Sequence, residues 1–93
     1  MFIQMSIHYP RQGKEELLID SMHRFGGAIS TQVGHRWNHT MCDEKTGRLV
    51  GIAVWDSKED MLAARPVMKG AVKDDDFDDW EERENETFYL HEI

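Results

Sequence analysis

The fold is decided by the stretch RLVGIAVWDSKEDMLAAR, residues Arg48 to Arg65. Its first half, Leu49–Trp55, is an unbroken apolar run, which is typical of a central strand covered on both faces. Ser57 can then cap a helix by accepting a hydrogen bond from the backbone N–H near Asp60. We expect this helix to end or kink at Pro66, because the residue before a proline resists helical geometry.

The other elements follow from the same periodicities. Alternating apolar residues predict strands, and an apolar stripe at i, i+4, i+7 and i+11 predicts a helix. The expected elements are strand Phe2–Tyr9, helix Lys14–Ile29, strand Val33–Cys42, strand Leu49–Trp55, a helix after Ser57, a short helical piece to Val72 and strand Thr87–Ile93. This β-α-β-β-α-β order predicts one α+β domain, residues 1–93, with a ferredoxin-like four-stranded antiparallel sheet.

The two faces of the predicted sheet differ in chemistry, because side chains alternate along a strand. An apolar face, expected to pack against the helices, collects Ile3, Met5, Ile7, Val50, Ile52, Val54, Phe88 and Leu90. A mixed face of polar, small and aromatic residues collects Gln4, Ser6, His8, Gly51, Ala53, Trp55, Tyr89 and His91. The mixed face resembles the wall of a ligand pocket, but the same composition would equally suit a dimer interface.

The facing of strand Val33–Cys42 depends on its register. In one register His35, Trp37 and His39 join the mixed face, and a slip of one residue sends them to the apolar face. Helices cover only one face of such a sheet, so something else must cover the other. A second subunit is the simplest candidate.

Composition limits the possible partners. The formal net charge is -7, and the stretch from Asp74 to Glu86 alone holds nine acids and one arginine. No basic surface is evident, which argues against nucleic acid as a partner. No apolar run approaches the ~20 residues of a membrane span, and no signal-peptide pattern is present. The single cysteine, Cys42, cannot form an internal disulfide, so a reducing cytoplasm is the natural location, and a disulfide between two subunits is the alternative.

The stretch GIAVWDSKEDMLAA, Gly51–Ala64, carries a family resemblance: a strand ends in Trp and is followed by Asp-Ser and a helix. With the order of elements, it resembles the dimeric α+β barrel superfamily and, within it, the antibiotic biosynthesis monooxygenase group. The resemblance implies a homodimer whose two sheets close a barrel, with a cavity between sheet and helices in each subunit. Some of these relatives oxygenate phenols or quinols without a cofactor, and others degrade haem.

The resemblance also suggests site residues. The Trp at the end of the family's third strand corresponds to Trp55. Where the oxygenases use an Asn in an early strand, this chain has Gln4 and Ser6. The segment in which the haem-degrading branch carries a ligating His reads Met61 to Arg65 and contains none.

His8 is the candidate catalytic base. We expect the first and third strands to run parallel and adjacent, so that His8 approaches Trp55, which would stack on a flat aromatic substrate. A neutral imidazole there could take a proton from a phenol or quinol. The candidate substrate-binding residues are Trp55, Trp37, Gln4, Ser6, Tyr89, His91 and His39. The alternatives are that Trp55 packs in the core and that His8 is an ordinary strand-end histidine.

No local metal site is expected, and the alternative is a site completed by His91 from another strand or subunit. His35 and His39 share a strand but stand about 13 Å apart at ~3.3 Å per residue, too far for one ion with Zn–N bonds of ~2.1 Å. The acids between Asp74 and Asp79 lack the spacing and glycine of an EF-hand, so a solvated face is the preferred interpretation.

Three functions remain open from the sequence. The first is a cofactor-independent monooxygenase that acts on a small flat aromatic. The second is a non-catalytic barrel that binds a small apolar ligand, and the third is a structural protein whose cavity is filled by side chains.

Overall fold

A computed structural model describes all 93 residues of the chain. The elements are β1 (Phe2–His8), α1 (Glu15–Ile29), β2 (His35–Cys42), β3 (Leu49–Trp55), α2 (Lys58–Ala63), α3 (Arg65–Val72), α4 (Phe77–Trp80) and β4 (Glu86–His91). The predicted α+β, ferredoxin-like order is confirmed, and the short helix α4 is added between α3 and β4. None of these helices is long and apolar enough to cross a membrane.

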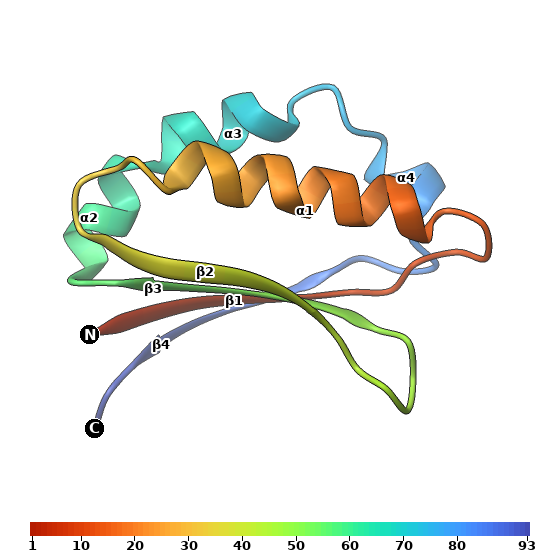
Figure 1. Ribbon diagram of the computed structural model, residues 1–93, viewed down its shortest axis with the longest axis horizontal. Coiled ribbons are helices and arrows are strands. Elements are labelled where there is room, and N and C mark those ends of the chain that lie inside the picture. Colours follow the sequence, from red (N-terminus) through yellow and green to blue (C-terminus); the bar gives the residue numbers. More distant parts are fainter.

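The four strands form one antiparallel sheet in the order β2-β3-β1-β4, with all the helices on one side (Figure 1). Ser57 caps α2 as predicted, accepting a hydrogen bond from the backbone N–H of Asp60 at 3.2 Å. The chain does break before Pro66: α2 ends at Ala63, and Pro66 lies in the first turn of α3, where its missing N–H costs nothing.

The expected parallel pairing of the first and third strands is wrong. β1 and β3 are adjacent but antiparallel, so Phe2 pairs with Trp55 and His8 pairs with Leu49. The cause is the β2–β3 hairpin, because β1 and β2 run parallel and β3, which returns from β2, lies between them. His8 and Trp55 therefore lie at opposite ends of the sheet.

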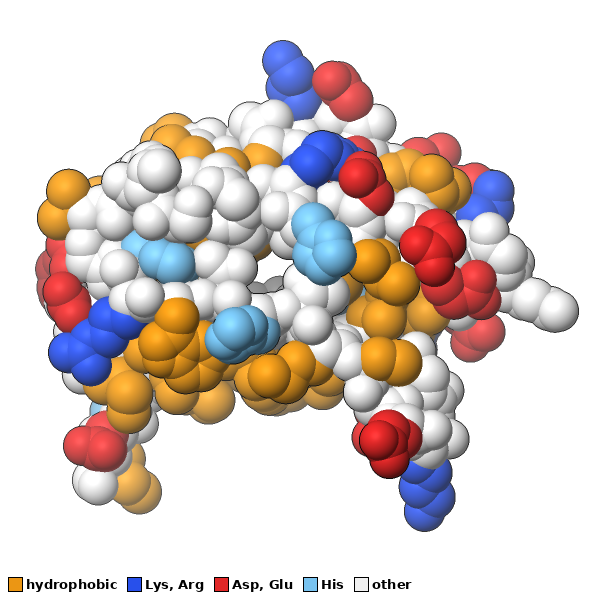
Figure 2. Space-filling view, viewed as in Figure 1, with side chains coloured by type: hydrophobic (Ala, Val, Ile, Leu, Met, Phe, Trp, Pro, Cys, Tyr) orange, Lys and Arg blue, Asp and Glu red, His pale blue; other side chains and the backbone are white.

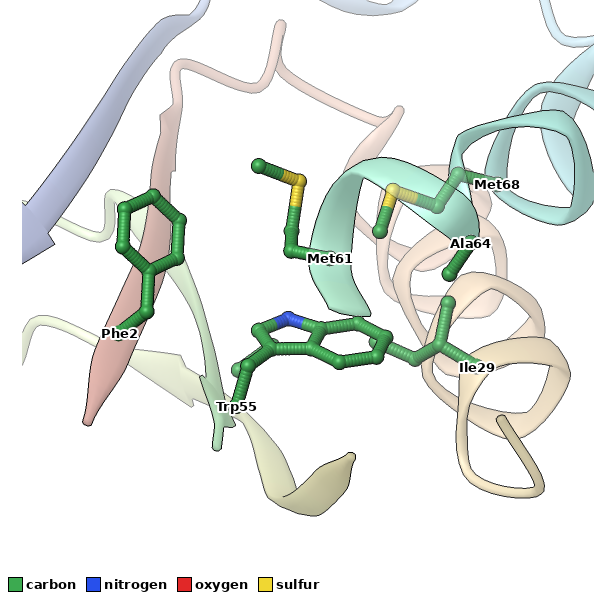
Figure 3. Packing of buried hydrophobic residues seen from close by; sticks show 7 residues of the cluster. Phe2, Ile29, Trp55, Met61, Ala64 and Met68 are labelled. Atoms are coloured by element: carbon green, nitrogen blue, oxygen red, sulfur yellow. The ribbon is translucent and has the colours of Figure 1, made fainter. Parts of the chain in front are cut away.

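The assignment of the two sheet faces is also reversed. The helices cover the mixed face, where Phe2, Ala53 and Trp55 pack with Ile29, Met61, Ala64 and Met68 (Figure 3). The predicted apolar stripe of α1 (Leu18, Met22, Phe25 and Ile29) faces this side. Alternation alone does not decide which face a helix covers when both faces carry apolar residues.

The apolar face is therefore open in the single chain. Figure 2 shows hydrophobic side chains gathered along the side of the sheet away from the helices. The exposed large residues on this face are Trp37, Met41, Phe88 and Leu90. Figure 1 also shows the β2–β3 hairpin and the end of β4 bending away from the helices.

A bulge in β2 splits the residues whose facing was left open. The register shifts between His35 and Trp37, so that His35 pairs with Trp55 while Trp37 pairs with Val54. Paired residues share a face, so His35 faces the helices. Its ring lies edge-on to that of Trp55, with 5.5 Å between the ring centroids. Trp37 lies on the apolar face together with His39, with 5.2 Å between their ring centroids. Each of the two alternative registers is thus correct for part of the strand.

Candidate functional site

A cavity of about 200 Å³ lies between the sheet and the helices. Figure 2 shows the surface hollowed there, between α1 and the sheet. The sheet contributes Gln4, Ser6, His8, Asn38, Thr40, Gly51, Ala53, Thr87 and Tyr89. The helices contribute Ser21, Met22, Phe25, Gly26, Ile29, Val72 and Phe77, and Asn85 comes from the segment before β4.

Small residues at the centre of the sheet make this space. Gly51 lies opposite Ser6, and a Cβ at Gly51 would come within 2.9 Å of the Ser6 hydroxyl and 3.2 Å of the Met22 methyl. Large side chains occur instead at the two ends, where Trp55 and Leu49 fill the core. These large side chains contact α1 near both of its ends, so a space remains between the helix and the small residues at the middle of the sheet.

The lining carries no Asp, Glu, Lys or Arg. It combines aromatic and aliphatic walls with neutral hydrogen-bonding groups, namely amides, hydroxyls and imidazole. Such a pocket suits an uncharged molecule with hydroxyl or carbonyl groups, because no ion in the wall compensates the desolvation of a charged ligand.

His8 is the titratable side chain that reaches the cavity from the end of β1. The residue is 9% exposed, and its Nδ1 lies 3.2 Å from Oε2 of Glu81. The centroid of its ring lies 6.2 Å from that of the Phe77 ring. Only Nδ1 of this ring is hydrogen-bonded within the protein, to Glu81, and Nε2 has no protein partner.

Glu81 is buried, at 4% exposure, although it comes from the acid-rich stretch Asp74–Glu86. Its Oε1 accepts the backbone N–H of Tyr9 at 2.9 Å, and its Oε2 also accepts from Nδ2 of Asn85 at 3.2 Å. Burial by itself raises the pKa of this carboxyl, but the hydrogen bonds from His8, Tyr9 and Asn85 outweigh burial and lower the pKa below its ordinary value of 4.5. Glu81 is therefore an ionised carboxylate at neutral pH.

A second polar group enters the cavity from β2. The Nδ2 of Asn38 donates to the carbonyl of Gly26 at 3.1 Å and lies 2.8 Å from Nε2 of His35. Burial lowers the pKa of His35, which keeps the ring neutral and able to accept this hydrogen bond. The amide carbonyl oxygen of Asn38 lies so close to α1 that a Cβ at Gly26 would overlap it.

Three of the predicted binding residues border the cavity from the mixed face of the sheet. Gln4, Ser6 and Tyr89 all line it, and the ring of Tyr89 stacks on that of Phe2 with 6.3 Å between centroids. Gln4 donates from Nε2 to the sulfur of Met68 at 3.5 Å, and its Oε1 is buried without a partner. An unpaired buried acceptor is costly, so a ligand or water that donates to it would be held firmly.

Trp55 does not border the cavity with His8. It is 0% exposed and lies in the core at the opposite end of the sheet (Figure 3), where its indole N–H has no partner. The expectation that His8 and Trp55 form one site is wrong, because antiparallel pairing separates them by the length of β1. Trp55 instead packs in the hydrophobic core, which was the alternative interpretation.

The remaining predicted residues lie elsewhere. Trp37 and His39 point their rings to the open apolar face, and His91 pairs with Phe2 at the end of the sheet far from His8. His39 borders the cavity only from its edge of the sheet, because its ring lies against that of Trp37. His35 and His39 therefore face opposite sides of the sheet and share no site. No cluster of three or more potential metal ligands occurs in the structure.

The sequence interpretation missed Glu81, Asn38, Ser21 and Gly26. For Ser21 and Gly26 a signal existed, because both fall on the apolar stripe of α1, at i+3 and i+8 from Leu18. The position of Asn38 in the cavity wall could not be predicted, because the bulge shifts the register of β2. Nothing in the sequence distinguishes Glu81 from the eight other acids of its stretch. One of these acids, Asp75, accepts a hydrogen bond from the Ser21 hydroxyl at 2.6 Å and forms an ion pair with Arg24 at 2.9 Å. For Asp75 the expected solvated face is wrong.

Several solved structures share this architecture over the whole chain. Rv0793 from Mycobacterium tuberculosis has a TM-score of 0.85 at 14% identity, over 99% of this chain and 94% of its own. A structure described as an antibiotic biosynthesis monooxygenase has a TM-score of 0.79 at 9% identity, over 100% and 99%. SnoaB from Streptomyces nogalater, described as a cofactor-independent oxygenase, has a TM-score of 0.75 at 14% identity, over 98% and 92%.

This chain has the antibiotic biosynthesis monooxygenase-like fold. No family model matches the sequence, and no curated protein matches it. At 14% identity or less, the likeness to these structures concerns the fold.

Two adjacent glycines of α1 provide a matched test of the cavity wall. Gly27→Ala adds a methyl group to open space and should raise the free energy of unfolding by about 0.5–1 kcal/mol, the usual gain of Ala over Gly in a helix. Gly26→Ala gains the same propensity but displaces the Asn38 amide from its two hydrogen bonds, so its net effect should be destabilising. Urea unfolding of both variants measures the difference, and equal stabilities would contradict the described position of Asn38.

The lowered pKa of Glu81 predicts a pH dependence of stability. Because the folded carboxyl binds its proton less readily than the unfolded one, its contribution is present above pH 4.5 and is lost as the pH falls through the folded value. The free energy of unfolding should therefore fall more steeply below pH 4.5 for the wild type than for Glu81→Gln. Urea titrations between pH 7 and pH 3.5 measure the slopes. The neighbouring exposed Glu82→Gln should keep the wild-type slope, and a Glu81→Gln slope equal to it would exclude this role of Glu81.

Proposed function

We propose that this chain is a cofactor-independent monooxygenase that oxidises a small, flat, uncharged phenol or quinol in the cavity between sheet and helices. One observation carries the proposal: an imidazole, His8, lies on the wall of an otherwise uncharged cavity, with a buried carboxylate on its Nδ1. The likeness in fold to a protein described as a cofactor-independent oxygenase is consistent with it.

His8 acts as the general base in this proposal. The Nδ1 of His8 lies against Glu81, whereas its Nε2 has no protein partner. Nε2 is then free to take the phenolic proton of a substrate, and Glu81 stabilises the imidazolium that results. The electron-rich phenolate reacts with O₂.

The substrate supplies all the electrons of this oxidation. For a quinol, one atom of O₂ enters the ring, the other leaves as water, and the product is a hydroxyquinone. Neither a flavin nor an external reductant is needed for this balance. Gln4, Ser6 and Tyr89 are proposed to hold the substrate, because they line the cavity and offer neutral donors and acceptors.

His8→Ala should lower the turnover of a quinol substrate by about 10²–10⁴-fold, the usual contribution of a general base, and change its binding much less. A panel of quinols, assayed by oxygen uptake and by quenching of Trp fluorescence, separates turnover from binding. His23→Ala removes an exposed histidine on the helix that covers the cavity and should leave both unchanged.

Two results would count against the proposal. Unchanged turnover in His8→Ala would remove His8 as the base. Quinol binding without oxygen uptake in the wild type would favour a non-catalytic barrel that holds a small ligand.

The proposal includes a homodimer in which two copies cover each other's apolar face. Ile3, Met5, Val50, Ile52, Phe88 and Leu90 share this face, and no element of the chain covers it. Exposed apolar patches of this kind mark interfaces, and two twisted sheets pack face to face about 10 Å apart. The single exposed cysteine, Cys42, supports the further proposal of a reducing, cytoplasmic location.

Light scattering at micromolar concentration should give the mass of a dimer, and Phe88→Lys should shift it toward that of a monomer, because a buried unpaired charge is costly. Leu62→Lys on α2 is the matched control, since Leu62 is as exposed (38%) as Phe88 (37%) but lies away from the apolar face, and it should remain a dimer. Circular dichroism checks that both variants are folded. A monomeric wild type would refute the dimer.

A further inference from the structure

Glu81 is the buried carboxylate that contacts the proposed base, His8. It is a carboxylate almost fully withdrawn from water, yet it lies outside the lining of the cavity and cannot touch a substrate there. Its two oxygens have different partners: Oε1 accepts from the backbone N–H of Tyr9, and Oε2 faces Nδ1 of His8 and Nδ2 of Asn85. Three neighbouring groups thus bind one ionised side chain.

The segment that carries Glu81 is itself fixed against β1. Tyr9 and Glu82 are joined by a backbone hydrogen bond of 2.8 Å, and the N–H of Arg11 donates to the carbonyl of Trp80 at 2.8 Å. Pro10 forms an isolated bridge with Glu81. The backbone therefore holds the carboxylate in place independently of the His8 contact.

We propose that Glu81 is a positioning residue that holds His8 in the Nδ1–H tautomer, so that the basic Nε2 lone pair stays available to the cavity. This inference rests on the proposed function, because it assigns Glu81 a role in preparing the same base. The constraint is one-sided, because a carboxylate has no proton to donate to Nδ1. In water, the neutral side chain of free histidine favours the other tautomer, which would leave Nε2 protonated.

Other charged groups lie nearby without replacing Glu81. The guanidinium groups of Arg48 and Arg83 lie over the ring of Tyr9, at 5.0 Å and 4.4 Å from its centroid. The hydroxyl of Tyr9 donates to Glu86. None of these groups has a hydrogen bond to His8, so Glu81 is the one charged partner of the ring.

Glu81→Gln is a sharp test, because the fixed N–H of Tyr9 dictates how the new amide lies. That N–H requires the amide oxygen, so the amide NH₂ takes the place of Oε2 and faces Nδ1 of His8. Because an NH₂ group cannot accept a hydrogen bond, Nδ1 of His8 must then be the acceptor, and the proton of the neutral ring must be on Nε2. The substitution should invert the tautomer and leave the shape of the side chain unchanged, as an Asp-to-Asn change does in a catalytic triad.

The tautomer is read from ¹⁵N-histidine-labelled protein by long-range ¹H–¹⁵N correlation at a pH where the ring is neutral. The signals that vanish in His8→Gln assign His8 among the five histidines. We expect Nδ1–H in the wild type and in Glu82→Gln, and Nε2–H in Glu81→Gln. The inference would be overturned if His8 carried its proton on Nε2 in the wild type, or if it kept its proton on Nδ1 in Glu81→Gln. The wild-type spectrum alone decides it if Glu81→Gln does not fold.

Oxygen uptake in the same variants separates this inference from the proposed function. With a quinol that the wild type oxidises, Glu81→Gln should lower kcat by at least about 10²-fold, the lower end for loss of a general base, and leave KM nearly unchanged. Glu82→Gln should retain the wild-type rate. An inverted tautomer with an unchanged rate would confirm that Glu81 positions His8 but remove His8 as the base. A retained Nδ1–H tautomer in Glu81→Gln would overturn the positioning role whatever the rate.

Discussion

The antiparallel register of β1 against β3 is the constraint on which the rest of the structure depends. It places Gly51 opposite Ser6 at the middle of the sheet, and Trp55 and Leu49 at its two ends. The large end residues support the helices, and the small central ones leave a cavity under α1. A shift of one residue would exchange the two faces of the strand and fill this space.

The two faces of the sheet serve different purposes. The mixed face forms a core at both ends and a polar cavity between them, whereas the apolar face has no partner within the chain. Such a division is understandable for a small domain, which buries only ~60% of its unfolded surface and often needs a second subunit. The bulge in β2 contributes to both faces, because it directs His35 inward and Trp37 outward.

The acid-rich segment is more than a solvated surface. Asp75 ties it to α1, Glu81 ties it to β1, and the short helix α4 between them puts Phe77 against the ring of His8. The only buried carboxylate of the chain thus comes from its most acidic stretch. Ionisation of Glu81 is maintained by three hydrogen bonds that outweigh the effect of burial on its pKa.

The sequence by itself determined the elements, their order, the cap at Ser57 and the residues that share a face in β1, β3 and β4, because these depend on local periodicity and on short-range hydrogen bonds. It also pointed to Gln4, Ser6, His8 and Tyr89, since alternation places them on one face. Only the tertiary structure decided which face the helices cover, that His8 and Trp55 are far apart, and that Glu81 meets His8. These are contacts between residues distant in the chain, 73 positions apart for Glu81 and His8, and no local pattern encodes such a pairing.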